Sequence, residues 1–365
     1  MATVFLTGFP GFLGSALVAT LLARYETPVT VTCLIQAKFR PLAQARVAAL
    51  AADNPDWPAR VRLVEGDITR PDLGLGDVRA DLQAETIEVF HLAAVYDLGV
   101  ARELAMRVNV DGTRHVLDFA TGCLNLRRFQ YVSTCYVSGR YPGIFTERDL
   151  SRSQAFNNYY EESKYLAELA VQQEMERGLP TTIYRPSIVT GDSRTGETQK
   201  FDGPLTYIRW ILRQPGPVAI LPVVGRPERM AVNVVPRDFV IGAIGYLSGR
   251  DVSLDKVYQL CDPSPPTVTE TINAIEAATG KRIVRLPLPK TVAKGALKYV
   301  PGLEQLMGID PESIEYFVLP TIYTCDNTID DLEGTGLLCP QFTDYLEPII
   351  GFMRANPDIS SRAMV

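Results

Sequence analysis

Short apolar runs alternate with longer amphipathic or alanine-rich stretches through the first 190 residues of the chain. The apolar runs have the length and β-branched content of buried strands, whereas the longer stretches are typical of helices. This alternation predicts an α/β fold with a doubly wound parallel sheet of the Rossmann type, covered by helices on both faces. The predicted strands are Thr3–Thr7, Val29–Ile35, Val61–Glu65, Ile87–His91, Phe129–Ser133 and Thr181–Arg185, and helices are expected to begin near Gly11, Leu42, Arg102 and Tyr160.

The pattern changes after residue 190. A stretch rich in glycine, proline and polar residues covers Gly191–Pro204, and shorter elements separated by prolines follow it. Because glycine and proline interrupt regular structure, we expect residues 1–190 to form one domain and 191–365 to form mainly a smaller C-terminal lobe. Two segments within about 231–262, Asn233–Val235 and Val257–Leu260, still have the pattern of strands of the first sheet. The two lobes are therefore predicted to be interleaved in the sequence.

A glycine-rich turn follows the first predicted strand. Gly8, Gly11 and Gly14 form the pattern G-x-x-G-x-x-G between that strand and the first helix. In this context the first glycine permits a tight turn, the second lets the backbone approach a pyrophosphate, and the third lets helix and strand pack closely. The helix N-terminus, at Phe12 and Leu13, offers free N–H groups to the anion. A turn without a ligand is the alternative, but the position directly after a buried strand favours a dinucleotide.

The end of the second predicted strand carries no carboxylate. A site that prefers NAD usually has Asp or Glu there, to bind the ribose 2′-hydroxyl. This chain has Gln36 instead, followed by Lys38 and Arg40, whose charges can pair with a 2′-phosphate. NADP(H) is therefore the predicted cofactor, with NAD(H) as the alternative. Two solvated cations near the start of a helix are the simpler interpretation of the same residues.

Tyr160 and Lys164 lie four residues apart at the start of a predicted helix and therefore share one face. A phenol has a reference pKa of about 10, and a neighbouring cation lowers it, so the pair suits general acid–base chemistry. Upstream, Ser133 and Thr134 end the fifth predicted strand, at the edge of the sheet where open α/β folds bind ligands. A helix-surface pair and capping hydroxyls are the structural alternatives. The occurrence of all three motifs in this order favours an active site.

Composition and charge exclude several other functions. The net charge is −6 and no basic block is present, which argues against a nucleic-acid partner. His91 and His115 are the only histidines, so no metal site is predicted. The six cysteines are widely spaced and the N-terminus has no secretion signal, which favours reduced thiols and a cytoplasmic protein. The longest apolar stretches are shorter than the roughly 20 residues of a transmembrane segment.

Taken together, these motifs resemble the extended short-chain dehydrogenase/reductase superfamily. Within it, the chain is most similar to the branch of fatty acyl-CoA reductases, with male-sterility type NAD-binding domains, and of carrier-bound thioester reductases. The resemblance covers roughly residues 3–210 and rests on TGFPGFLG, EGDIT, HLAAVYD, NVDGT, VSTCYVSG, NNYYEESK, RPSIVTGDSRTGE and FDGP, with looser support from NVVPRDFV and VYQLCDP. It implies an NADPH-dependent oxidoreductase that transfers hydride to the carbonyl of a fatty-acyl or other acyl thioester, giving an aldehyde or an alcohol.

The resemblance also implies roles for individual residues. Tyr160 is the implied proton donor, Lys164 contacts the nicotinamide ribose, and Thr134 holds the substrate oxygen. Asn109 is expected in the helix behind the catalytic turn, with a structural or water-holding role. The other implied cofactor-site residues lie near the adenine, the pyrophosphate and ribose, or the nicotinamide: Asp67, Ile68, Leu92, Ala93, Ala94, Ser133, Pro186 and Ile188.

Two departures from this branch leave other functions open. Gln36 stands where the branch often has arginine, and the chain ends at residue 365 without the additional C-terminal domain of many alcohol-forming reductases. A reductase or dehydrogenase of a free aldehyde, ketone or secondary alcohol, hydroxysteroid-like or sugar-nucleotide-like, is the second interpretation, and a non-catalytic NADP-binding protein is the third. A homodimer is common in the superfamily. A lipophilic substrate is expected because the second lobe offers an apolar set of candidate lining residues: Tyr207, Trp210, Ile211, Leu212, Ile220, Leu221, Tyr316 and Phe317.

Overall fold

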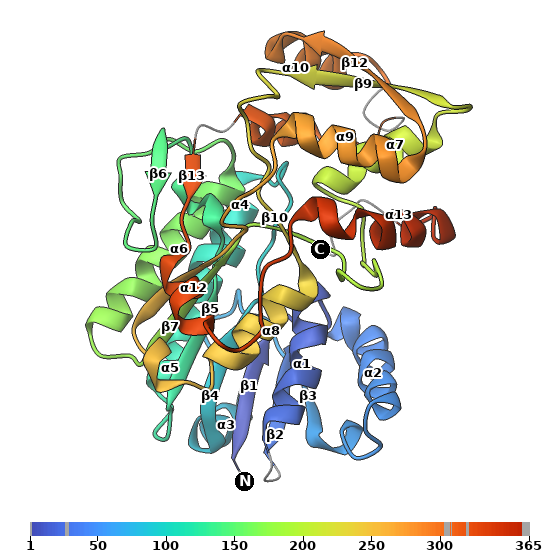
Figure 1. Cartoon of the computed structure of the whole chain (residues 1–365). Coiled ribbons are helices and arrows are strands. Elements are labelled where there is room, and N and C mark those ends of the chain that lie inside the picture. Colours follow the sequence, from blue (N-terminus) through green and yellow to red (C-terminus); the bar gives the residue numbers. More distant parts are fainter. Residues whose placement is uncertain (1, 26–28, 303–306, 308, 319–320, 360–365) are drawn as a thin grey trace.

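A seven-stranded parallel sheet forms the centre of the molecule (Figure 1). The computed structural model describes residues 2–25, 29–302, 307, 309–318 and 321–359. The strand order is β11-β7-β5-β4-β1-β2-β3. From β1 the chain adds β2 and β3 on one side of the sheet and then β4 and the later strands on the other side, so the order of strands reverses between β1 and β4. Doubly wound sheets bind ligands outside the carboxyl ends of the strands at such a point. The strands are β1 (Thr3–Thr7), β2 (Thr30–Ile35), β3 (Val61–Glu65), β4 (Thr86–His91), β5 (Arg128–Val132), β7 (Thr181–Pro186) and β11 (Lys256–Leu260).

Helices cover both faces of this sheet. One face packs on α1 (Phe12–Arg24), α2 (Arg40–Ala49) and α8 (Arg237–Leu247). The other face packs on α3 (Val78–Glu85), α5 (Gly112–Thr121) and α6 (Tyr159–Glu176). A short helix, α4 (Arg102–Ala105), continues through a π-helical turn at Met106–Asp111 into α5. The two buried clusters confirm the predicted doubly wound architecture.

A second core lies above the carboxyl ends of the strands in Figure 1. Its layers are a two-stranded parallel sheet of β9 (Val218–Val224) and β12 (Arg282–Leu288), and the helices α7 (Pro204–Arg213), α9 (Val268–Thr279) and α13 (Leu346–Ala355). The smaller elements are β6 (Gly143–Phe145), β8 (Ile188–Thr190), β10 (Val234–Pro236), β13 (Thr321–Tyr323), α10 (Lys290–Tyr299) and α12 (Asp326–Leu332). In the part of the chain that is described, no helix combines the length and the apolar character needed to cross a bilayer.

The predicted strands agree with the structure apart from one segment. Strands β1 and β3 have the predicted bounds, and Val257–Leu260 joins the main sheet as β11. The prediction was wrong for Asn233–Val235, because β10 pairs with β8 in a separate two-stranded sheet. Helix α3 was not predicted. Leu82 is its only buried residue, so it lacks the apolar stripe from which a helix is recognised in a sequence.

Candidate active site

Two hydroxyl-bearing residues meet at the carboxyl end of β5. Thr134 caps the turn Cys135–Ser138, where its Oγ1 accepts a hydrogen bond from the Tyr136 backbone N–H at 3.3 Å. Tyr160 lies in the first turn of α6, and Asn158 caps that helix by accepting from the Glu161 N–H at 3.0 Å. The Thr134 hydroxyl lies close enough to the Tyr160 phenol to lower the pKa of that phenol. The fold therefore joins two groups that are 26 residues apart in the sequence.

Burial raises the pKa of the Tyr160 phenol well above its ordinary value, and the neighbouring Thr134 hydroxyl acts in the opposite direction. The expectation that a neighbouring cation lowers this pKa is wrong in this structure, because the loss of hydration is the larger effect. The phenol is therefore protonated at neutral pH. This is the state required of a group that donates a proton.

The ammonium of Lys164 is held against β5. Its Nζ donates to the Tyr131 hydroxyl at 2.8 Å and to the Val132 carbonyl oxygen at 2.9 Å, and it lies 4.4 Å from the centre of the Tyr131 ring. Burial lowers the pKa of Lys164 to about 7, and the Glu168 carboxylate acts against this shift. A lysine with this pKa changes charge within the physiological range.

This lowered pKa predicts a pH-dependent difference in stability between the protein and a Lys164→Met variant. Between pH 7 and 10 the unfolded chain retains a proton that the folded chain has lost, so the stability of the wild type rises with pH. The variant lacks this group, and we expect the free energy of unfolding of the wild type, relative to the variant, to increase over that interval. Urea unfolding at several pH values measures the difference. A constant difference would contradict the lowered pKa.

A fully buried ion pair lies behind these residues and was not anticipated from the sequence. Arg185 donates from Nε and Nη2 to Glu168 Oε1 at 2.9 and 2.5 Å, and both side chains have no exposed surface. The Ser133 hydroxyl donates to Glu168 Oε2 at 2.5 Å. Ser133, which the resemblance places at the cofactor, is thus engaged in this network. The only sequence feature that could have indicated this ion pair is Glu168, which lies one helical turn after Lys164.

Asn109 connects the loop after β4 to α6. Its Nδ2 donates to the Val95 carbonyl oxygen and to Ser163 Oγ, both at 2.9 Å, and its Oδ1 accepts from the Val95 N–H at 2.8 Å. The residue lies in the π-helical turn before α5, a distortion that is frequent at functional sites. All these contacts are to protein groups, so Asn109 braces the loop after β4 against α6.

The three glycines of the first turn pack so closely that a side chain at any of them would collide with the backbone. Gly8 has φ +94°, and a Cβ there would lie 2.9 Å from Leu92 and from the N of Ala93. A Cβ would lie 2.8 Å from the Gly8 carbonyl oxygen at Gly11 and 2.5 Å from it at Gly14. Phe12 and Leu13 follow at the start of α1, and Ala94 continues the partly buried loop after β4. This cradle fits the pyrophosphate of a dinucleotide.

Gly14→Ala tests this cradle. We expect it to lower the free energy of unfolding by about 1–3 kcal/mol and to weaken NADPH binding at least about tenfold, because the added methyl displaces the turn. Gly295→Ala in α10 is the matched control, since nothing lies within 4 Å of its Cβ position. Chemical unfolding and NADPH titration measure both effects. Equal results for the two variants would show that the turn is not tightly constrained.

The residues expected near the adenine lie together at the ends of β2 and β3. Gln36 Nε2 donates to Asp67 Oδ2 at 3.1 Å, and the side chain of the buried Ile68 faces Gly112. Arg40 pairs with the Glu65 carboxylate, and both are half exposed. The exposed Lys38 lies 4.9 Å from the centre of the Phe39 ring. A carboxylate at this position, as in sites that prefer NAD, could not donate this hydrogen bond to Asp67.

The residues expected near the nicotinamide and the substrate lie between the two cores. Pro186 ends β7, its carbonyl oxygen accepts from Thr134 Oγ1 at 3.4 Å, and Ile188 packs against the core of the second lobe. Tyr316 contacts Tyr136 edge-on at 4.6 Å. Of the other apolar candidates, Ile211 and Leu221 are buried in the lobe core, Tyr207, Trp210 and Leu212 are partly buried, Ile220 is half exposed, and the side chain of Phe317 lies outside the described residues.

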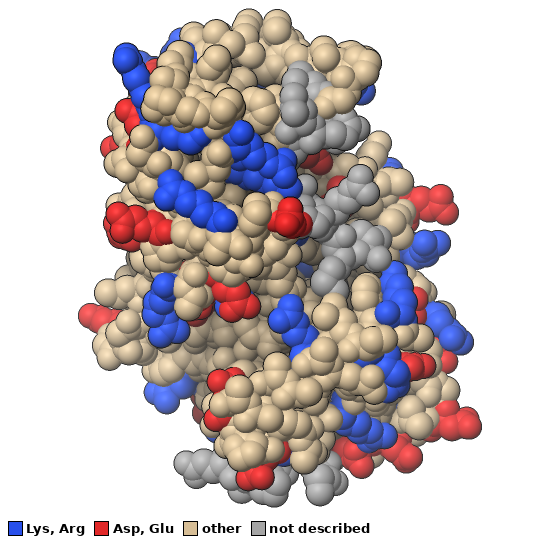
Figure 2. Space-filling view, turned by 90° about the vertical axis from the view of Figure 1, so that its right-hand side faces the viewer, with Lys and Arg blue, Asp and Glu red and all other residues tan. Residues whose placement is uncertain are grey.

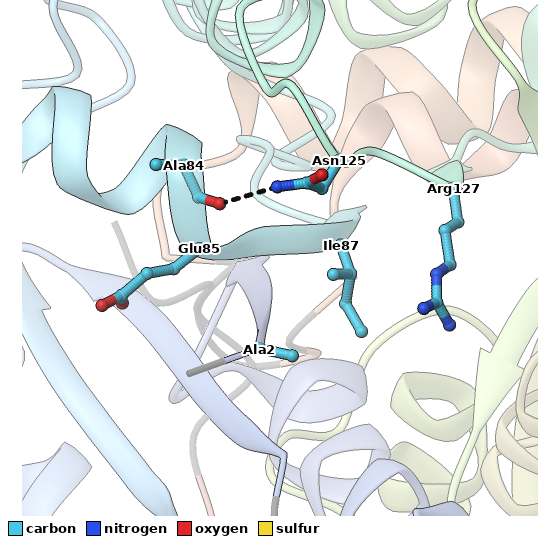
Figure 3. Close-up of a pocket in the computed structure, with 6 residues that line it drawn as sticks. All are labelled: Ala2, Ala84, Glu85, Ile87, Asn125 and Arg127. Atoms are coloured by element: carbon cyan, nitrogen blue, oxygen red, sulfur yellow. Dashed lines mark hydrogen bonds between the residues drawn. The ribbon is translucent and has the colours of Figure 1, made fainter.

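The hollow in Figure 3 lies at the opposite end of the sheet from Thr134 and Tyr160. It has a volume of about 420 Å³ and is lined by residues at the amino ends of β1, β4 and β5: Ala2, Ala84, Glu85, Ile87, Asn125 and Arg127. None of the predicted site residues lines it. Among the described residues, no cluster of three or more His, Cys, Asp or Glu side chains is placed to bind a metal ion.

The strand order, the glycine turn and the hydroxyl pair define the class of protein, an oxidoreductase of the extended short-chain dehydrogenase/reductase type with an NAD(P)-binding domain. Residues 6–244 match the family model described as male sterility protein, and the chain belongs to this family.

Known relatives include proteins that are longer than this chain. The chain is 29% identical over 282 residues to a subunit of the linear gramicidin synthase of Brevibacillus parabrevis, and the match covers 74% of this chain and 5% of that protein. It is 27% identical to the fatty acyl-CoA reductase wat of Drosophila melanogaster, over 83% of this chain and 65% of that one. The crystal structure of the terminal R domain from the myxalamid PKS-NRPS biosynthetic pathway is similar with a TM-score of 0.82 and 27% identity, over 100% of this chain and 93% of that one.

Proposed function

We propose that this protein is an NADPH-dependent reductase of acyl thioesters, with a fatty-acyl thioester as the substrate that suits it best. The observation that carries the proposal is the proximity of the Thr134 and Tyr160 hydroxyls at the sheet edge where the glycine turn also lies. The relatives that are named as a fatty acyl-CoA reductase and as an R domain support the same substrate class.

The chemistry follows from the positions of these side chains. Thr134 and Tyr160 together hold the carbonyl oxygen of the substrate, and the phenol gives its proton to the negative charge that develops there. Bound NADPH supplies the hydride. Gly8, Gly11 and the start of α1 hold its pyrophosphate, and Lys164 binds its ribose. Reduction of a thioester gives a hemithioacetal, which releases the thiol and leaves an aldehyde.

A cofactor preference is part of the proposal. Lys38 and Arg40 are the cations beside the end of β2, and Gln36 carries no charge that would repel a 2′-phosphate. NADPH is therefore expected to bind more tightly than NADH. Arg40 must exchange Glu65 for the phosphate, so the preference is expected to be smaller than in a site with a preformed phosphate pocket.

The experiment offers the purified protein a long-chain acyl-CoA or the matching fatty aldehyde, each with NADPH and with NADH, and follows the loss of the reduced nicotinamide. Turnover of the acyl-CoA is the expected result, and analysis of the products separates an aldehyde from an alcohol. Turnover of the aldehyde alone would move the protein to the free-carbonyl reductases. Tight NADPH binding without any turnover would contradict reduction of these substrates.

A further inference from the structure

Arg237 is far from the glycine turn in the sequence but lies directly beside it in the structure. It is the first residue of α8, which packs along α1. Its guanidinium carbon is 5.2 Å from the centre of the ring of Phe12, the residue that begins α1. Its backbone N–H donates to the Gly191 carbonyl oxygen at 3.2 Å. Arg237 thus touches both the cofactor turn and the loop at which the second lobe begins.

Two carboxylates lie near the Arg237 guanidinium, but neither is close enough to form a short, charged hydrogen bond with it. Arg237 Nη2 lies 3.7 Å from Asp192 Oδ2 and 3.5 Å from Glu197 Oε2, both longer than an ordinary charged hydrogen bond. The other oxygen of Asp192 already accepts the backbone N–H groups of Arg194 and Thr195, each at 3.0 Å. Among the described residues the guanidinium forms no side-chain hydrogen bond. It therefore retains donors for a further acceptor.

The charges around Arg237 affect how strongly an anion can bind at the N-terminus of α1. The N-terminus of α1 attracts an anion through its free N–H groups and the helix dipole, whereas Asp192 and Glu197 repel one. Arg237 lies among these groups with only 14% of its side chain exposed, so its charge is weakly screened. Figure 2 shows a hollow at mid-height on one face, between the two halves of the molecule, with both basic and acidic side chains around it.

We propose that Arg237 is a binding residue for the pyrophosphate of the cofactor, and that it links this group to the loop Gly191–Pro204 of the second lobe. A guanidinium presents paired donors that match the oxygens of a phosphate. It also offsets the two carboxylates that would otherwise repel the anion. The inference rests on dinucleotide binding at the glycine turn and does not depend on which carbonyl compound is reduced.

Arg237→Gln is expected to raise the Kd of NADPH about tenfold, because one charge-assisted contact is lost and two carboxylates are left uncompensated. Arg237→Lys keeps the charge and is expected to give an intermediate Kd. Glu197→Gln removes a repelling charge and is expected to lower the Kd. Titration of the intact protein, followed by NADPH fluorescence without substrate, measures each value. Arg226→Gln is the matched control, because Arg226 is exposed and its loss is expected to leave the Kd unchanged.

A second ligand separates a direct contact from a structural effect. Adenosine 2′-monophosphate has no pyrophosphate, so its Kd is expected to be the same for the wild type and Arg237→Gln. Equal losses of affinity for both ligands, or an unchanged Kd of NADPH in Arg237→Gln, would overturn the inference. A wild type that binds NADPH but reduces no carbonyl compound would refute the proposed function while the effect of Arg237 on binding still stands.

Discussion

Replacing Tyr160 with phenylalanine is expected to lower kcat by about 10²–10⁴-fold, the usual contribution of a positioned general acid. The phenyl ring keeps the packing of the first turn of α6 but has no proton to give to the developing oxyanion. Because the phenol is proposed to act on the substrate, the Kd of NADPH is expected to remain close to that of the wild type. Steady-state kinetics with the best substrate and NADPH titration together measure the two effects.

The neighbouring residue supplies the control for this prediction. Tyr159 is also in the first turn of α6, but this residue is 46% exposed and does not belong to the Thr134–Tyr160 pair. Tyr159→Phe removes the same atom and is expected to leave kcat almost unchanged. Full activity of Tyr160→Phe would exclude Tyr160 as the proton donor, and Thr134 or a bound water would have to supply the proton.

Glu168→Gln is expected to have the largest effect on stability, a loss of about 3–5 kcal/mol in the free energy of unfolding. The substitution leaves the charge of Arg185 uncompensated in a place where neither side chain has exposed surface. It also weakens the contact that Ser133 makes with α6. Urea unfolding followed by circular dichroism measures the loss, at a pH where the wild type is fully folded.

A second glutamate of α6 provides a matched control. Glu174 pairs with Arg177 three residues later, and that arginine side chain is 72% exposed. Since exposed ion pairs contribute about 0–1 kcal/mol, Glu174→Gln is expected to change stability by no more than that. Similar losses for both variants would mean that water reaches Glu168 and Arg185 in solution.

Two charged residues of α6, Lys164 and Glu168, affect each other's surroundings. Lys164 loses part of its charge through burial, whereas Glu168, one turn away, favours that charge. The same carboxylate is tied to β7 through Arg185 and to β5 through Ser133. Glu168 thus fixes the position of α6 on the sheet and also affects the electrostatic environment of Lys164.

The main sheet, the glycine turn and the shared helix face of Tyr160 and Lys164 could be predicted from the order of the residues alone. Each of these rests on a local signal: a run of apolar residues, a glycine pattern after a strand, or two residues one helical turn apart. Such local patterns can be recognised without knowing how the rest of the chain folds. For this reason the bounds of β1 and β3 were predicted correctly at both ends.

The contacts between these elements became visible only in the folded molecule. The pairing of β10 with β8, the ion pair of Glu168 with Arg185 and the place of Arg237 beside Phe12 all join segments apart in the chain. The raised pKa of Tyr160 also depends on burial by distant segments, and for that reason the effect expected from Lys164 was misjudged. Desolvation and long-range pairing are properties of the packed molecule, because they depend on which surfaces exclude water from one another.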